Sequence, residues 1–371
     1  CMVPIINLPY CSVIGGWVIK YLFTFAGRQG VQAAGDTYFT GFISQQYSPI
    51  LFMLIFLLLS AVVVYYGVDK GIENLSKYLM PALLVLVIGI SVFSLTLSYQ
   101  DASGVTRTGL QGLKIYLVPS LKGVSFKDFM VVVMDALGQL FFSISVAMGI
   151  MVAYGSYVKK ESNLMFCINQ IEIFDTAVAL LAGMMIVPMV YVFMGREGMS
   201  GGPGLMFVSL PKVFKAMGGV GGYVGVAFFV MVAFAAVTSA VSIMEAIVSS
   251  MMDKFHLSRH LSVILVTVYA IVGGIVVCLG YNKFYFELKL PNGSVAQILD
   301  LMDYISNNIL MPVVALMTCI LIGWVAGPKT IIDEVCYGDR KFGRRGLYIV
   351  MIKVIAPILL FVLLLQSFNI L

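Results

Sequence analysis

Acidic side chains inside long apolar stretches are the first sign of chemistry in this 371-residue sequence. A carboxylate is costly in hydrocarbon, so it is kept there only where it serves a cation, a partner or a water-filled cavity. Asp175 and Glu245 lie deep inside such stretches. For Asp135, Glu172 and Asp300, a place in water at the end of a stretch explains the charge equally well. The six candidates are Asp135, Glu172, Asp175, Glu245, Asp300 and Asp303.

Small and polar residues gather in the middle of the apolar segment 128–157, which contains Asp135-Ala-Leu-Gly-Gln-Leu-Phe-Phe-Ser-Ile-Ser-Val-Ala-Met-Gly149. An interrupted helix here would free carbonyl and amide groups to bind an ion or a substrate. The same residues also suit a close-packing helix face. Taken alone, this segment favours the packing interpretation.

Adjacent hydroxyls lie in a second apolar segment, 219–252, at Thr238 and Ser239. Hydroxyl and carbonyl oxygens are the ligands that a hard cation such as sodium prefers. Each hydroxyl could instead donate to a carbonyl of the preceding helical turn. For these two residues alone, the second interpretation is the simpler one.

Enzyme and metal motifs are not found in the sequence. It contains no HExxH, no nucleophile elbow and no catalytic carboxylate pair on one face. His256 and His260 have a spacing that can bind zinc on a helix, but a solvated loop pair is the simpler interpretation. A channel is disfavoured because no filter sequence is repeated. The cysteines have no CxxC-type spacing and are interpreted as small core residues; they are Cys1, Cys11, Cys167, Cys278, Cys319 and Cys336.

Composition places the chain in a membrane. It is 60% hydrophobic and only 11% charged, whereas soluble domains carry about 25% charged residues. The long, unbroken apolar runs predict helices rather than barrel strands. The net charge of +5 comes from basic residues scattered over short loops, so a nucleic-acid partner is not expected. Nine spans are predicted, at 3–26, 49–68, 76–99, 128–157, 171–194, 219–252, 259–281, 297–326 and 346–369.

Loop charge predicts the orientation. Eleven basic residues lie in one set of alternate short loops and ten in the other, longer set. The denser set is expected in the cytoplasm, which puts residue 1 inside and residue 371 outside. No loop is long enough for a soluble domain, so residues 1–371 are treated as one domain of a multi-pass plasma-membrane protein.

Five segments occur in the order found in one transporter family: Tyr10-Cys-Ser-Val-Ile-Gly-Gly-Trp17; Gly67-Val-Asp-Lys-Gly-Ile-Glu73 with Met80-Pro81; Gly138-Gln-Leu-Phe-Phe-Ser143; Gly204-Leu-Met-Phe-Val-Ser-Leu-Pro211; and Thr238-Ser239 with Ile243-Met244-Glu245. The chain resembles the neurotransmitter:sodium symporter family, most closely its bacterial amino-acid transporters. The resemblance implies an all-α membrane protein with the LeuT-like inverted-repeat transporter fold.

The resemblance also implies that part of the family's fold is missing from this chain. Its first span resembles the family's third, and the chain begins at Cys1 rather than Met. We expect residues before Cys1, because the first family helix would supply much of both sodium sites and the basic halves of both gates. An inactive remnant of a transporter is therefore the alternative to an active one.

Two sodium sites are implied by the resemblance. Thr238 and Ser239 match the hydroxyl ligands of one site, beside the Ala235 carbonyl. Ser143 matches the hydroxyl ligand of the other site, which also touches substrate, and Asp175 falls at or next to a position where many members have Asn.

The resemblance further implies chloride independence. Members without a carboxylate at the position of Asp175 need a bound chloride to balance the cation, and here the carboxylate would supply that charge. Gln139 would be a chloride neighbour in the dependent members and is expected to orient Asp175 instead.

The resemblance assigns the substrate site as well. Phe142 matches an aromatic lid, and Asn7 would face the pocket from the first span. The family usually has two tyrosines where this sequence has Tyr10 and Cys11, and the second tyrosine meets the substrate carboxylate. Cys11 is a shorter and weaker donor, so a water or a different substrate could fill the gap; an amino acid is favoured. The rest of the side-chain pocket would be Ser145, Met148, Ser239 and Ile243.

Gates and mechanism complete these expectations. Asp303 matches the acidic half of the extracellular gate, Asp253 that of the intracellular gate, and Tyr157 its cap. The expected function is sodium-coupled symport of an amino acid or similar small zwitterion, by alternating access.

Overall fold

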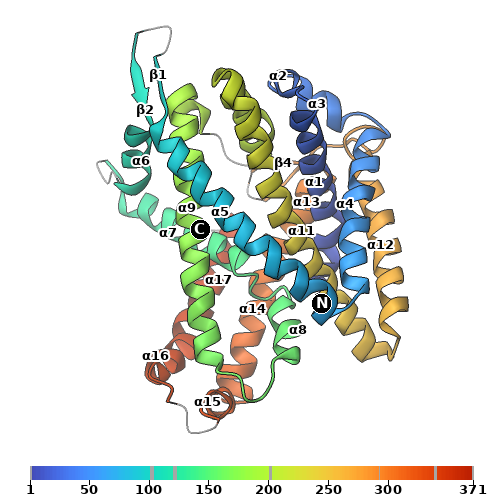
Figure 1. Ribbon diagram of the computed structural model, residues 1–371. Helices are drawn as coiled ribbons and strands as arrows, with labels where there is room; N and C mark the ends of the chain where they lie inside the picture. Colours follow the sequence, from blue (N-terminus) through green and yellow to red (C-terminus); the bar gives the residue numbers. More distant parts are fainter. Residues whose placement is uncertain are drawn as a thin grey trace.

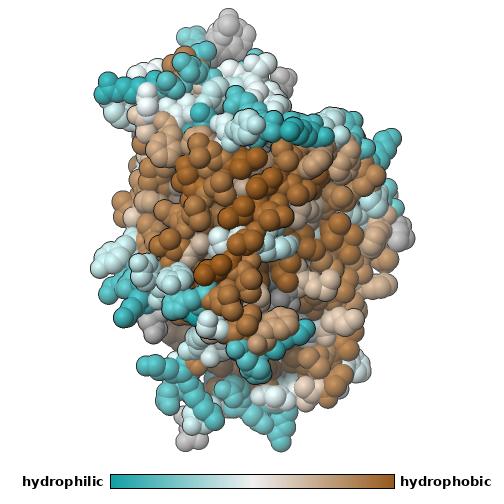
Figure 2. Space-filling view, turned by 90° about the vertical axis from the view of Figure 1, so that its right-hand side faces the viewer, coloured by the Kyte–Doolittle hydropathy of each residue, from teal (hydrophilic) through white to brown (hydrophobic). Residues whose placement is uncertain are grey.

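The computed structural model describes residues 2–100, 104–119, 123–199, 203–291, 293–337 and 341–369, without the side chains of Asp69, Phe126, Lys127, Phe142 and Glu197. Cys1 therefore lies outside the described residues. Within them, eight helical segments are long and apolar enough to cross a membrane. Figure 2 shows a broad apolar band between two polar ends, as expected for a protein surrounded by lipid.

The long helices follow the predicted spans closely, and several contain a short π-helical segment, labelled η. They are α1 (Met2–Ala26), α4 (Ser48–Tyr65), α5 (Asn74–Thr96) after η1 (Val68–Glu73), α9 (Leu164–Met194), α11 (Gly219–Phe255), α12 (Arg259–Leu279), α13 (Ile298–Asp303) continuing through η4 (Tyr304–Leu310), α14 (Met311–Ile320) and η5 (Leu321–Val325), and α16 (Arg345–Val350) continuing through η6 (Met351–Ile355) and α17 (Ala356–Ser367) (Figure 1).

Shorter elements connect them. Two antiparallel hairpins lie in loops, β1 (Ser98–Gln100) with β2 (Thr106–Thr108) and β3 (Leu288–Lys289) with β4 (Val295–Ala296). The remaining short helices are α2 (Gly30–Ala33), α3 (Tyr38–Ile43), α6 (Gly109–Leu117), the 3-10 turn η2 (Arg196–Gly198), η3 (Leu205–Ser209), α10 (Leu210–Ala216) and α15 (Lys329–Val335).

The predicted span 128–157 is two helices rather than one. They are α7 (Phe126–Ser143) and α8 (Ile150–Tyr157), separated by residues 144–149. Ser145, Ala147 and Gly149 have φ angles of 55°, 66° and 79°, which no regular right-handed helix accommodates. The packing interpretation of this segment is therefore wrong, and the interrupted helix is confirmed.

Helix α1 forms the centre of the molecule, packed between α4, α11 and α12. Close approach to α4 depends on Gly16, where a Cβ atom would lie 2.5 Å from the Met53 backbone nitrogen. Nearer its C-terminal end, the buried Trp17 ring packs edge-on against Phe39 and Phe207, at centroid distances of 5.2 and 5.7 Å. Since Phe207 belongs to η3, this aromatic cluster fixes the loop segment 205–216 on the helical core.

Proline within a membrane helix leaves a carbonyl free one turn earlier, and a neighbouring helix has to bond it. Pro188 lies inside α9, and the carbonyl that it leaves free is that of Met184. The buried Ser94 hydroxyl of α5 donates to this oxygen at 2.8 Å, and Ser91 donates to the Leu181 carbonyl at the same distance. The two serines therefore join α5 to the weakened turn of α9.

Replacing Ser94 with Ala tests this joint. We expect the free energy of unfolding in detergent micelles to fall by about 1 kcal/mol, because the Met184 oxygen loses its donor in an apolar interface. Thr96→Ala is the matched control, since the Thr96 hydroxyl donates only within its own exposed turn. An equal loss in both variants would contradict the joint.

Candidate functional site

The helix break brings a hydroxyl and a carboxylate together. Ser143, the last residue of α7, donates its hydroxyl to Asp175 Oδ1 of α9 at 2.6 Å. Among the described residues, no Lys or Arg pairs with the half-buried Asp175. Its negative charge is therefore available to a cation, and oxygen ligands of this kind suit sodium. The two residues predicted for one sodium site are thus direct neighbours.

The hydroxyls predicted for the other sodium site lie on α11. Thr238 Oγ1 donates to the carbonyls of Phe234 and Ala235, both at 3.0 Å. Thr238 therefore bonds to the preceding helical turn, which was the alternative to sodium binding in the sequence analysis. It uses the hydroxyl proton and leaves oxygen lone pairs free to bind a cation. Ala235 and Ser239, one turn apart, are both exposed.

A closed ring of hydrogen bonds joins α1 to η4. Asn307 Nδ2 donates to the Tyr10 hydroxyl at 3.0 Å, and Tyr10 donates to Asn7 Oδ1 at 3.2 Å. Asn7 Nδ2 closes the ring at Asn307 Oδ1, 3.5 Å away. Asn307 also donates to Asp303 Oδ1 at 2.7 Å, so the predicted gate residue is held by this ring. Asn7 and Tyr10 are only 1% and 2% exposed, so the ring is closed off from solvent.

Residues predicted for the substrate pocket are found near the break. Asn7 Nδ2 lies 3.9 Å from the sulfur of the buried Met148, and Ile243 of α11 is buried as well. Ser145 lies in the break and is half-buried, as is Cys11 on α1. The side chain of Phe142 lies outside the described part of the chain. The structure thus brings Asn7 of α1 to Met148 at the break.

A cavity of about 490 Å³ opens between α7, η4 and α17. It is lined by two acidic side chains, Asp135 and Asp303, and by no Lys or Arg of the described chain. Gln366 donates to Asp135 Oδ1 at 3.3 Å. Gln139 and the predicted gate residue Asp303 both line this cavity, and the predicted role of Gln139 in orienting Asp175 stays a prediction.

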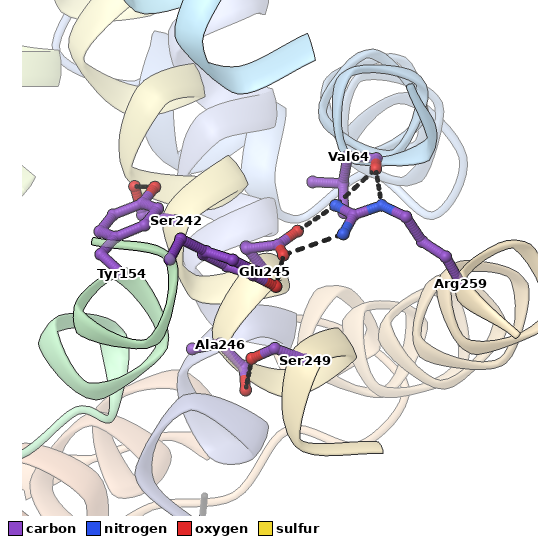
Figure 3. Close-up of polar contacts among 8 residues, drawn as sticks. Val64, Tyr154, Ser242, Glu245, Ala246, Ser249 and Arg259 are labelled. Carbon is purple, nitrogen blue, oxygen red and sulfur yellow. Dashed lines mark hydrogen bonds and ion pairs between the residues drawn. The ribbon is translucent and has the colours of Figure 1, made fainter. Parts of the chain in front are cut away.

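A buried ion pair lies near the turn between α11 and α12 (Figure 3). Glu245 is completely buried and pairs with Arg259, whose Nη1 lies 3.1 Å from Glu245 Oε1. Arg259 Nε and Nη2 also donate to the Val64 carbonyl, at 3.0 and 2.9 Å, at the end of α4. Tyr157 of α8 donates to Glu245 Oε1 at 2.9 Å. One carboxylate thus connects four helices.

Only part of this network can be predicted from the sequence. The depth of Glu245 in its apolar segment indicates an important carboxylate, but no pattern in the sequence indicates that Arg259 is its partner. The structure brings Tyr157 to Glu245, whereas Asp253 is exposed and has no ion pair within the described ranges. The gate role of Asp253 stays a prediction. The His260 ring packs against Tyr65 at an interplanar angle of 47°, with ring centroids 4.3 Å apart.

Removal of Arg259 should lower the free energy of unfolding far more than removal of an arginine from an exposed ion pair. Arg259→Ala leaves the Glu245 charge and the Val64 carbonyl unpaired, and we expect a loss of about 3–5 kcal/mol in unfolding free energy. Arg344→Ala is the control, because its pair with Glu172 is about half exposed and such pairs contribute about 0–1 kcal/mol. Equal losses in denaturant titrations would show that the buried pair is not the stronger contact.

Comparison with known proteins identifies the group to which these features belong. A model described as the sodium:neurotransmitter symporter family matches residues 42–371. The chain is 30% identical over 326 residues to a sodium-dependent transporter of Haemophilus influenzae, covering 86% of this chain and 67% of that one. It is also 30% identical to the sodium-dependent transporter YhdH of Bacillus subtilis, covering 98% of this chain and 77% of that one.

Solved structures agree with the sequence matches. The structure of MhsT in complex with L-phenylalanine superposes with a TM-score of 0.83 at 32% identity, over 99% of this chain and 79% of that one. The predicted LeuT-like fold is therefore confirmed. The chain belongs to the sodium:neurotransmitter symporter family.

Proposed function

We propose that the protein is a symporter that uses sodium ions to carry an amino acid or similar small zwitterion across the plasma membrane into the cell. The observation that carries the proposal is the Asp175 carboxylate, which pairs with no Lys or Arg of the described chain and is bonded to Ser143 at the end of an interrupted helix. A fixed negative charge beside a hydroxyl oxygen is what a cation needs inside a membrane protein. The family to which the chain belongs supports sodium as that cation.

Thr238 and Ser239, with the Ala235 carbonyl, would form the second sodium site on α11. Asp303 would close the outer side of the site and Phe142 would cover the substrate, while Tyr157 and Asp253 would act at the inner side. Each sodium ion that crosses 100 mV gains about 2.3 kcal/mol, which drives the substrate uphill. We further propose that Asp175 makes chloride unnecessary.

An amino acid is supported as substrate by the similarity to MhsT, which binds L-phenylalanine in its solved structure. Tyr10 and Cys11 lie on the wall where the substrate carboxylate is expected. The Tyr10 hydroxyl is already bonded to Asn7 and Asn307. The contact with the substrate carboxylate would therefore fall to Cys11, whose side chain is shorter. A water between Cys11 and the carboxylate would restore the missing contact.

An inactive remnant of a transporter is the alternative to an active symporter. The deciding experiment is uptake of a labelled amino-acid mixture by cells that express the whole native locus, in sodium and in potassium medium. Uptake that requires sodium supports symport. No uptake, with the protein shown to be in the membrane, supports the remnant.

The α11 hydroxyls can be tested directly. Thr238→Ala combined with Ser239→Ala should raise the sodium concentration for half-maximal substrate binding about tenfold or more, because the cation loses two oxygen ligands. Thr267→Ala is the control, since this α12 hydroxyl donates to its own helix in the same way, at 2.7 Å from the Val263 carbonyl. An unchanged sodium dependence in the double variant removes the site from α11.

Asp175→Asn tests the charge argument. The amide keeps the shape but not the charge, so transport should become dependent on chloride, measured as uptake in chloride and in gluconate medium. Glu172→Gln, one turn earlier on α9, neutralises a carboxylate that is paired with Arg344 and should leave uptake independent of chloride. If Asp175→Asn transports equally in both media, the carboxylate does not replace chloride.

A further inference from the structure

Pro9 interrupts the hydrogen bonds of α1 directly before the two residues on the substrate wall. It lies inside the helix Met2–Ala26 and has no N–H group, so the Ile5 carbonyl one turn earlier loses its helical donor. Tyr10 and Cys11 follow at once. The weakest turn of α1 is therefore the turn that carries the proposed site.

Helix α12 supplies the missing donor. The Tyr269 hydroxyl donates to the Ile5 carbonyl at 2.9 Å, across 264 residues of sequence. Tyrosine suits this contact, because its rigid ring spans the distance between two helices and its hydroxyl donates at the far end. The bond restores what Pro9 removed, as membrane interiors require of freed backbone groups.

The same face of α12 makes a second contact one turn later. A Cβ atom on Gly273 would lie 2.9 Å from Pro9 Cγ and 3.0 Å from Pro9 Cβ, so only glycine leaves room for the proline ring. Tyr269 and Gly273 are four residues apart, as are Ile5 and Pro9, so each pair lies along one helix face. The two helices are joined at two points one turn apart.

This joint lies directly behind the proposed site. At 3.6 residues per turn, Asn7 and Cys11 lie on the face of α1 opposite Pro9. Asn7 belongs to the ring that holds Asp303 through Asn307, and it also approaches Met148 at the helix break. A shift of α1 at the Pro9 turn would therefore move Cys11 and the ring together.

We propose that Tyr269 and Gly273 of α12 are positioning residues, which set substrate affinity from behind the site by fixing the Pro9 turn of α1. The proposal rests on the proposed function for its consequence, but not for its geometry. It predicts that the Tyr269 hydroxyl matters only while Pro9 is present, because alanine at position 9 would regain an N–H for the Ile5 carbonyl.

The experiment is a double-mutant cycle of Tyr269→Phe and Pro9→Ala in the full-length protein, read out by sodium-dependent binding of labelled L-phenylalanine. Tyr269→Phe alone should raise the concentration for half-maximal binding about three- to tenfold, the effect of losing the one donor that replaces the missing Pro9 N–H at the Ile5 carbonyl. In the Pro9→Ala background the same substitution should change it less than about twofold. Equal effects in both backgrounds, or none in either, would overturn the proposal.

Tyr21→Phe is the matched control, because it removes a tyrosine–carbonyl bond of 2.8 Å from the same helix, at Phe207. Tyr21 lies twelve residues after Pro9. We therefore expect Tyr21→Phe to change the concentration for half-maximal binding by the same small factor with and without Pro9→Ala. Gly273→Ala should weaken binding in the parent and less so in Pro9→Ala, where the ring is gone.

Cys11 gives a second readout that needs no substrate. Its rate of alkylation by a small maleimide is measured in a variant whose other cysteines are replaced by Ser or Ala: Cys1, Cys167, Cys278, Cys319 and Cys336. Tyr269→Phe should change this rate at least about twofold, Tyr21→Phe should not, and Pro9→Ala should abolish the difference. If the parent binds no amino acid, the proposed function fails. If Tyr269→Phe leaves the rate of Cys11 alkylation unchanged, the positioning role fails.

Discussion

Every carbonyl and amide of this chain that lies in hydrocarbon has to be bonded by protein, and the structure depends on that requirement wherever a helix is irregular. At Pro188 the freed Met184 carbonyl is bonded by Ser94, and at Pro9 the freed Ile5 carbonyl is bonded by Tyr269. In both places the donor comes from a distant part of the sequence. Irregular turns therefore become the points where helices are joined, rather than points where they separate.

The same requirement applies to the carboxylates Glu245 and Asp175, which lie within the long helices α11 and α9. Glu245 is tolerated in full burial because Arg259 and Tyr157 surround it, and Arg259 in turn saturates the Val64 carbonyl at the end of α4. Asp175 is different, since its only recorded bond is to the Ser143 hydroxyl. A carboxylate that is bonded but not neutralised within the described residues is a candidate for holding a cation. The two acids therefore differ in that Glu245 is neutralised by Arg259, whereas Asp175 is not paired with a described Lys or Arg.

The family, the fold and eight of the nine predicted spans could be predicted from the sequence, because long apolar runs and ordered motifs are local features. The interruption at 144–149 could not be decided from local residues, since small residues suit a packed helix and a broken one equally. It was indicated only by the resemblance. Arg259 was missed because its partner depends on the turn between α11 and α12, where His256 adopts a left-handed conformation, with a φ angle of 53°. Tyr269 was missed because a contact across 264 residues leaves no sequence pattern.

These long-range contacts also link helices that are far apart in the sequence. α1 meets η4 through the ring of Asn7, Tyr10 and Asn307, and it meets α12 through Ile5 and Pro9. α12 begins at Arg259, which holds Glu245 and, through it, Tyr157 of α8. Asp303 is thus tied to α1 through Asn307, α1 is tied to α12 through Tyr269, and α12 is tied to α11 through Arg259. α8 follows the break directly and is tied to α11 at two points, by Tyr157 at Glu245 and by Tyr154, whose hydroxyl lies 2.7 Å from that of Ser242.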